Sequence, residues 1–255
     1  MSYPDGNLTT RAIVKHGQYA LIPPEGRVNN NVPGFEDCNI SIIASPELGA
    51  GFAQYVTEVL PGGKTTEIFG GDGLETFIYT LEGKGKVTVE GQTEELTEGG
   101  YAYAPPTSGM EIKNESDESW RVFMHKQVYE PLEGYSVRPV FGNSNDLEGE
   151  IYEDMENVFL KTFLPDEMGF DVNFYILTFE TDGSHPFIET HMQEHGLYFL
   201  QGQGMYLLDN EWVPVEKEDY IWFGPYVPQA YYCTGRESTS YIYSKNCNRD
   251  VPLKK

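Results

Sequence analysis

The sequence has few cysteines, few basic residues and no long apolar run. Its 255 residues include three cysteines, Cys38, Cys233 and Cys247, and no pair has the CxxC spacing. This excludes a zinc ribbon and a disulfide framework and favours a reducing compartment, so we expect a cytoplasmic protein. Lysine and arginine number 17 against 40 acidic residues, for a net charge of −23. That charge argues against nucleic acid and against anionic membrane surfaces as partners.

Membrane spans and export signals are also missing. No stretch of about 18 apolar residues occurs, so we expect no segment to cross a membrane. The first ten residues, MSYPDGNLTT, contain no basic region followed by an apolar run, which argues against a secretory signal. An aromatic content of 14% is instead typical of a chain that folds around a core.

Short runs rich in valine, isoleucine, tyrosine and phenylalanine recur between glycines and prolines. The segments KGKVTVEG (84–91), GFDVNFYILTFE (169–180) and STSYIYSKN (238–246) are examples. Their alternation and their β-branched and aromatic content predict strands. Long segments with helical periodicity are scarce, so we predict an all-β protein.

The chain repeats itself at a fixed offset of 119 residues. From about residue 46 to 133 no gap is needed, and Pro46 aligns with Pro165. A repeat this long indicates two whole domains, each with enough short strands for a small barrel or jelly roll. We therefore predict two tandem jelly-roll β-barrels, an N-terminal one with an N-terminal extension over 1–146 and a C-terminal one over 147–255.

Three of the five histidines, His185, His191 and His195, lie in one segment, GSHPFIETHMQEHGLYFLQGQG, at 183–204. On a strand, Glu189 and His191 would point to the same face. His195 would keep that parity, or face them from the next strand after a turn. A carboxylate and two imidazoles that converge suit a divalent transition metal. We predict a metal site here.

The residues from His191 to His195 also match H-x-x-E-H, the inverted signature of zinc proteases. That signature requires a helix. A glycine follows at once and the next residues, LYFL, are typical of a strand, which argues against a protease. In the first copy of the repeat the three candidate ligands become Gly70, Asp72 and Thr76. Only the second copy is therefore predicted to hold a metal.

The spacing of this segment resembles the first motif of the cupins, G-x5-H-x-H-x3-E-x6-G. Here it covers 183–202 with every spacing kept, but Glu189 replaces the first histidine and His195 replaces the glutamate. The spacing of the second cupin motif places Gln229 where the last histidine ligand would be. Most other residues of that second motif are absent, so Gln229 depends on register alone.

This ligand set, with several other segments, resembles the bicupin family of (S)-ureidoglycine aminohydrolases. The other segments are RAIVKHG (11–17), GFEDCN (34–39), EGGYAYAPP (98–106), IETHMQEHG (188–196) and YIYSKNCNRD (241–250). The resemblance implies one Mn²⁺ per chain, bound by Glu189, His191, His195 and Gln229. It implies a C–N hydrolase that releases ammonia from (S)-ureidoglycine to give (S)-ureidoglycolate in the breakdown of allantoin and other purine ureides. It also implies a homo-oligomer.

The donor set agrees with this metal chemistry. Two imidazoles, one carboxylate and one amide oxygen suit Mn²⁺ or Fe²⁺ better than thiol-seeking metals. With a divalent ion, such a site carries a net charge of about +1 and attracts a carboxylate substrate. A metal can bind the substrate or hold the attacking water, and both possibilities remain open.

Tyr206, Tyr241 and Lys245 are further candidates for substrate binding. Tyr241, Tyr243 and Lys245 alternate, so they share one face of a strand. The resemblance favours Lys245 as the partner of the substrate carboxylate or of the leaving amine, although the first copy also has a lysine, Lys126. Tyr206 and Tyr241 are valines in the first copy, which suggests that their hydroxyls orient the substrate.

Glu189 is also a candidate proton acceptor in addition to its role as a ligand. Two alternatives to the hydrolase remain. Two histidines and a carboxylate also form the triad of non-haem Fe(II) dioxygenases, and a bicupin can bind small molecules without catalysis. The solitary His16, His125 and His185 are predicted to have no direct role in the chemistry.

Overall fold

The computed structural model describes residues 10–251, which form β-strands and two 3₁₀ turns but no α-helix. Over this range no helix is long and apolar enough to cross a membrane. The prediction about a secretory signal concerns residues that, apart from the tenth, lie outside the described range.

Twenty strands occur in the described range. The strands before the first barrel are β1 (Ile13–Lys15) and β2 (Tyr19–Ile22). The next are β3 (Phe35–Ala44), β4 (Phe52–Thr65), β5 (Leu74–Glu82), β6 (Gly85–Val89), β7 (Gln92–Leu96), β8 (Gly100–Ala104), β9 (Glu111–Lys113), β10 (Trp120–Val128) and β11 (Val140–Asn143). The last are β12 (Glu150–Tyr152), β13 (Met155–Thr162), β14 (Val172–Phe179), β15 (His195–Gln201), β16 (Gln203–Leu208), β17 (Glu211–Glu216), β18 (Tyr220–Phe223), β19 (Gln229–Cys233) and β20 (Thr239–Asn246). The 3₁₀ turns are η1 (Pro24–Gly26) and η2 (Ser144–Asp146).

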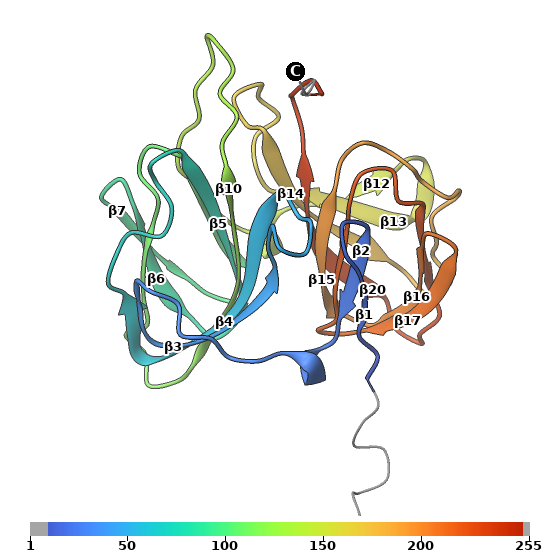
Figure 1. The fold of residues 1–255 in the computed structure, drawn as a ribbon, viewed down its shortest axis with the longest axis horizontal. Helices are drawn as coiled ribbons and strands as arrows, with labels where there is room; N and C mark the ends of the chain where they lie inside the picture. Colours follow the sequence, from blue (N-terminus) through green and yellow to red (C-terminus); the bar gives the residue numbers. More distant parts are fainter. Residues whose placement is uncertain (1–9, 252–255) are drawn as a thin grey trace, which may run out of the picture.

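The strands form two barrels that lie side by side (Figure 1). In the first barrel the order β11-β8-β5-β10-β4 continues into β9-β6-β7, and β3 also pairs with β4. The second barrel has β18-β15-β20-β14-β13-β12 in one sheet and β17-β16-β19 in the other. The strands expected at 84–91, 169–180 and 238–246 correspond to β6, β14 and β20. The predicted all-β class with two tandem barrels is confirmed.

The offset of 119 residues is also visible in the strands. Adding it to β6 (Gly85–Val89) gives 204–208, and β16 spans Gln203–Leu208. Adding it to β10 (Trp120–Val128) gives 239–247, and β20 spans Thr239–Asn246. The sequence repeat is therefore a structural repeat in the same register.

The N-terminal strands join the sheet of the second barrel, although they precede the first barrel in the sequence. β2 pairs with β18 of the second barrel, and β11, which follows the first barrel's last strand, pairs with β8 of the first. The sheets change between β11 and β12, close to the predicted boundary of 146/147. Residues 13–22, in the expected N-terminal extension, lie in the sheet of the second barrel. Such long-range pairing leaves no local signal in the sequence.

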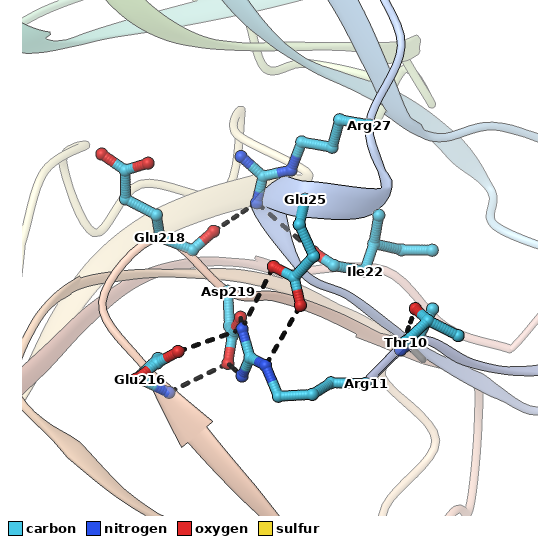
Figure 2. A network of polar contacts seen from close by, with 9 residues as sticks. Thr10, Arg11, Ile22, Glu25, Arg27, Glu216, Glu218 and Asp219 are labelled. Carbon is cyan, nitrogen blue, oxygen red and sulfur yellow. Dashed lines mark hydrogen bonds and ion pairs between the residues drawn. The ribbon is translucent and has the colours of Figure 1, made fainter. Parts of the chain in front are cut away.

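A polar network of hydrogen bonds and ion pairs connects the N-terminal segment, residues 10–27, to the second barrel (Figure 2). The Arg11 guanidinium donates two hydrogen bonds to Asp219, at 2.7 and 2.8 Å. Glu25 and Glu216 also approach Arg11, each at 3.2 Å. The Asp219 side chain is fully buried, so its paired bonds with the guanidinium offset the cost of removing the carboxylate from water.

Three apolar clusters fill the molecule, one inside each barrel and one between them. The cluster between the barrels is rich in aromatic rings. The Phe77 ring of β5 stacks on the Phe174 ring of β14, with centroids 3.7 Å apart. Aromatic pairs of this kind add to the burial of apolar area. The two barrels thus share a core and pack as one unit.

Candidate metal centre

All seven predicted site residues line one cavity inside the second barrel. Its volume is about 20 Å³, which is room for about one water molecule or ion. The lining residues are Tyr152, Leu177, His185, Glu189, His191, His195, Leu197, Tyr206, Gln229, Tyr241, Tyr243 and Lys245. They come from β12, β14, β15, β16, β19, β20 and the loop before β15, so the fold brings together residues far apart in the sequence.

Glu189 lies in a loop rather than on the continuous strand expected for this segment. The strand β15 begins only at His195, and Glu189 forms an isolated bridge with Gln229. Their backbones exchange two hydrogen bonds of 2.9 Å each. Pro186 has no N–H to donate, which works against a regular ladder through this part of the loop. The bridge nevertheless places Gln229, predicted from spacing alone, beside Glu189.

The two histidines present unprotonated nitrogens to each other. Nδ1 of His191 lies 3.0 Å from the carbonyl oxygen of Gln193, and Nδ1 of His195 lies 2.8 Å from that of Ser244. Because a carbonyl oxygen can only accept, each Nδ1 carries the proton and each Nε2 has a free lone pair. The two Nε2 atoms are 3.3 Å apart. Metal-binding histidines are typically oriented in this way by a bond from the other ring nitrogen.

Burial keeps both imidazoles neutral. Burial, and then the neighbouring His191, lower the pKa of His195 to about 3. Burial and the charge of Lys245 lower the pKa of His191 as well. Two lone pairs that face each other at this distance repel, and a cation bound to both would remove the repulsion. The residues present therefore fit a divalent metal ion.

The Glu189 carboxylate lies beside the two histidines and is the third candidate ligand. Its Oε2 lies 3.9 Å from Nε2 of His191 and accepts a hydrogen bond from Nε2 of Gln229. Its Oε1 lies 3.3 Å from the donating hydroxyl of Tyr152. Burial raises the pKa of Glu189 above its usual value. Among residues 10–251, no three His, Cys, Asp or Glu side chains are grouped closely enough to hold a metal ion as they stand.

Gln229 is held by two partners in the cavity. Its Nε2 donates to Glu189, and its Oε1 accepts a 2.6 Å hydrogen bond from the Tyr206 hydroxyl. Ligation through the amide oxygen would therefore require the amide group to rotate. The same bond shows that Tyr206 acts directly on a candidate ligand, a contact that sequence comparison of the two copies did not indicate.

The alternating face of β20 is confirmed. Tyr241, Tyr243 and Lys245 all line the cavity. Lys245 lies opposite His195 in the ladder between β20 and β15. Burial raises the pKa of Tyr241 and Tyr243 well above the usual value, so both phenols stay protonated at neutral pH.

Two polar lining residues, Tyr152 and His185, were not predicted from the sequence as part of the site. Tyr152 comes from the β12–β13 hairpin, where its acidic neighbours are typical of a solvated segment. His185 accepts the Tyr231 N–H at Nδ1 over 2.8 Å, so its proton is on Nε2. Burial lowers the pKa of His185 to about 4. Only its place two residues after Gly183, within the cupin-like motif, could have indicated its position.

The protease interpretation of H-x-x-E-H is excluded by the structure. The segment is a loop and the start of a strand, not a helix. Glu194 is turned away from the two histidines and accepts hydrogen bonds from the Gly51 N–H and from Nε1 of Trp222. It therefore cannot act as the general base of a metal site formed by these histidines.

The paired barrels and the cluster of two imidazoles and a carboxylate inside one of them define the chain as a bicupin. A cupin domain model matches residues 55–126, in the barrel without the cluster. The chain belongs to the (S)-ureidoglycine aminohydrolase family. It is 50% identical over 252 residues to (S)-ureidoglycine aminohydrolase of Escherichia coli (strain K12), covering 98% of this chain and 97% of that relative.

Other relatives agree with this assignment. An (S)-ureidoglycine aminohydrolase of Arabidopsis thaliana is 28% identical over 247 residues, covering 94% of this chain and 79% of the relative. The crystal structure of protein Ylba from E. coli superposes with a TM-score of 0.88 at 47% identity, covering 99% of this chain and 100% of that one. The family resemblance and the bicupin fold inferred from the sequence are confirmed.

Proposed function

We propose that the protein hydrolyses (S)-ureidoglycine to (S)-ureidoglycolate and ammonia. Water replaces the amine at the α-carbon, so one C–O bond forms and one C–N bond breaks. The family membership supports the reaction. The observation that supports a metal-dependent mechanism is the pair of facing Nε2 lone pairs of His191 and His195, 3.3 Å apart beside Glu189.

We propose one Mn²⁺ per chain, held by Glu189, His191, His195 and Gln229. The donors would be two nitrogens and two oxygens, a set that suits Mn²⁺ or Fe²⁺. A divalent ion there supplies positive charge that can attract a carboxylate and polarise a bound oxygen. The first barrel has glycine, aspartate and threonine at the positions of the first three ligands, which supports a single metal per chain.

Lys245 and two tyrosines are proposed to bind the substrate. The Lys245 ammonium lines the cavity and would pair with the substrate carboxylate. Burial raises the pKa of Tyr206 and Tyr241 well above the usual value. Both phenols therefore keep their protons and can donate hydrogen bonds to the ureido or carboxylate oxygens.

Glu189 is proposed to accept a proton during the reaction. Burial raises the pKa of this carboxyl group, so it is a better base than an exposed glutamate. It could take the proton from the attacking water and pass it to the leaving amine.

The cavity of about 20 Å³ is smaller than ureidoglycine, so the substrate enters only if lining side chains move.

We propose that the protein is a cytoplasmic homo-oligomer. All three cysteines are free thiols, which agrees with a reducing compartment. Exposed apolar side chains gather on the two paired segments beside the cavity, namely Phe187, Ile188, Tyr226 and Tyr232. Apolar surface of this kind is typical of protein interfaces. Light scattering of the purified protein tests the oligomer, and a monomer would contradict it.

The reaction is tested by ammonia release from ureidoglycine generated in situ from allantoate. The metal-stripped protein is assayed with and without added Mn²⁺. We expect metal-dependent ammonia and a single enantiomer of ureidoglycolate. Ammonia at the spontaneous rate with metal bound would contradict the proposal, and oxygen uptake with Fe²⁺ would identify a dioxygenase instead.

A further inference from the structure

The loop that carries the candidate ligands is attached to the first barrel, which has no such ligands itself. Glu194 lies between His191 and His195 in the sequence. Its carboxylate accepts the N–H of Gly51, at 2.9 and 3.1 Å to its two oxygens. It also accepts a 2.9 Å hydrogen bond from Nε1 of Trp222. Gly51 directly precedes β4 of the first barrel, so this bond crosses the interface between the barrels.

On the other side of His195, Gly196 lies against Gln54 of β4. A Cβ atom at Gly196 would lie 2.1 Å from Oε1 of Gln54 and 2.4 Å from the hydroxyl of Tyr220. Gln54 is fully buried, and its Oε1 accepts a 2.5 Å hydrogen bond from Tyr220. Only a residue without a side chain lets β4 approach β15 this closely.

Gln54 also reaches the residue that orients His195. Its Nε2 donates to Oγ of Ser244 at 3.0 Å. The carbonyl oxygen of Ser244 accepts the Nδ1 proton of His195 at 2.8 Å. The first barrel therefore contacts the chain immediately before His195, immediately after it, and at its hydrogen-bond partner.

We propose that Gly51 and Gln54 of the first barrel are positioning residues that fix the His195 imidazole for metal binding. They act through Glu194, Gly196 and Ser244 and never touch the metal or the substrate. This gives the metal-free barrel a function in the chemistry of the other barrel. The proposal rests on the proposed metal site, and partners that orient a metal ligand typically change metal affinity by about 10- to 100-fold when removed.

Gly51→Ala is the most direct test, because it leaves every residue of the second barrel unchanged. The added methyl group would lie 2.4 Å from Oε1 of Glu194 and meets no other residue within 4 Å. It would displace the carboxylate and break the anchor. Gly26→Ala is the matched control, since a Cβ atom there meets nothing within 4 Å.

The measurement is the Mn²⁺ dissociation constant of the full chain, with the melting temperature of the metal-free protein in parallel. We expect Gly51→Ala to raise the dissociation constant about 10-fold. The metal-free melting temperature should stay near that of the unaltered protein, and excess Mn²⁺ should restore kcat. Gly26→Ala should change none of these.

Glu194→Gln provides a second, independent variant. Both carboxylate oxygens accept from N–H donors, so an amide would place its NH₂ group against one of them. Glu167→Gln is its control, because the exposed Glu167 carboxylate pairs with Arg138 and not with a residue of the ligand loop. Glu194→Gln should weaken Mn²⁺ binding about as much as Gly51→Ala, and Glu167→Gln should not.

The possible failures are distinguishable. Unaltered Mn²⁺ affinity in both Gly51→Ala and Glu194→Gln would overturn the positioning role and leave the proposed function intact. A lower melting temperature with unchanged affinity would also overturn it, since that result describes a purely structural contact. If the unaltered protein binds no Mn²⁺, the proposed metal site fails and this inference fails with it.

Discussion

The two barrels have the same strands in the same register but different interiors. The cavity of the second barrel is lined mainly by polar and ionisable side chains, and at five of these positions the first barrel has a small or apolar residue. The pairs, first barrel then second, are Thr76 and His195, Val87 and Tyr206, Met110 and Gln229, Val122 and Tyr241, and Met124 and Tyr243. The repeat thus specifies a scaffold, and a few inward positions specify the chemistry.

One inward position is the same in both barrels. Lys126 corresponds to Lys245, yet it lies over the rings of Tyr55 and Phe69, at 5.7 and 5.6 Å from their centroids. Burial lowers the pKa of Lys126. In the first barrel this lysine packs on aromatic rings. A lysine at this register is therefore not sufficient for function, and its neighbours decide its role.

Substitutions at the proposed ligand positions should show the largest difference in activity between the two barrels. His195→Ala should lower kcat/KM for ureidoglycine by about 10³-fold or more, because it removes a proposed ligand and with it the charge of the proposed metal. The equivalent change in the first barrel, Thr76→Ala, should leave kcat/KM within about twofold. Kinetics and metal content measured on both variants check this, and equal losses would show that both barrels take part in the reaction.

The next largest difference in activity is expected between substitutions of Lys245 and Lys126. Lys245→Met should lower kcat/KM by about 10- to 100-fold, since a hydrogen bond to a charged group contributes about 1.5–3 kcal/mol. Lys126→Met should leave activity unchanged, because its ammonium group only contacts rings. Steady-state kinetics of the Lys245→Met and Lys126→Met variants tests this difference. A comparable loss in Lys126→Met would mean that the first barrel binds substrate.

A smaller effect is expected from single hydroxyl groups. Tyr206→Phe removes the 2.6 Å bond to Gln229 and should lower kcat/KM by about 10-fold. Tyr101→Phe in the first barrel removes the bond to the Phe163 carbonyl, 3.1 Å long, and should cost about 1 kcal/mol of stability without changing kcat/KM. Kinetics and denaturant unfolding of both variants test this. Normal activity in Tyr206→Phe would remove this tyrosine from the site.

The smallest expected effect is on stability, and it comes from His125, where the two barrels meet. Burial lowers its pKa to about 3 from an ordinary value of 6.5. Below pH 6.5 the unfolded chain binds the proton and the folded protein does not, so this histidine's contribution to stability is lost as pH falls from 6.5 toward 3. The loss is about 1.4 kcal/mol per pH unit.

Unfolding of the His125→Gln variant by denaturant between pH 6.5 and 5 measures that contribution. The free energy of unfolding should fall less steeply with decreasing pH than in the unaltered protein, by about 1.4 kcal/mol per unit. Identical slopes in the two proteins would show that His125 does not stay neutral.

Much of the architecture could be predicted from the sequence because the signals are local. Strand alternation is visible in segments such as 238–246, and the repeat preserves register over most of the chain. The pairing of β2 with β18 of the second barrel joins segments about 200 residues apart in the sequence. Periodicity within a window of residues cannot reveal such pairing.

The candidate site was also predicted where its signals are local in the sequence. It was incomplete where residues meet through long-range pairing. Glu189, His191 and His195 are close in sequence with a spacing that indicates a metal, and Gln229 followed from a motif. The irregular loop around Glu189 was not predicted, because its form depends on the bridge to Gln229 on β19. Tyr152 reaches the cavity only through the β12–β13 hairpin, so nothing near the motif could indicate it.

The central claim is that only the second barrel binds a metal. It is tested most directly by titrating the metal-stripped protein with Mn²⁺ and comparing it with the His191→Ala, His195→Ala double variant. We predict one tightly bound ion per chain in the unaltered protein and none in the double variant. Two ions per chain, or one ion retained by the double variant, would contradict the account.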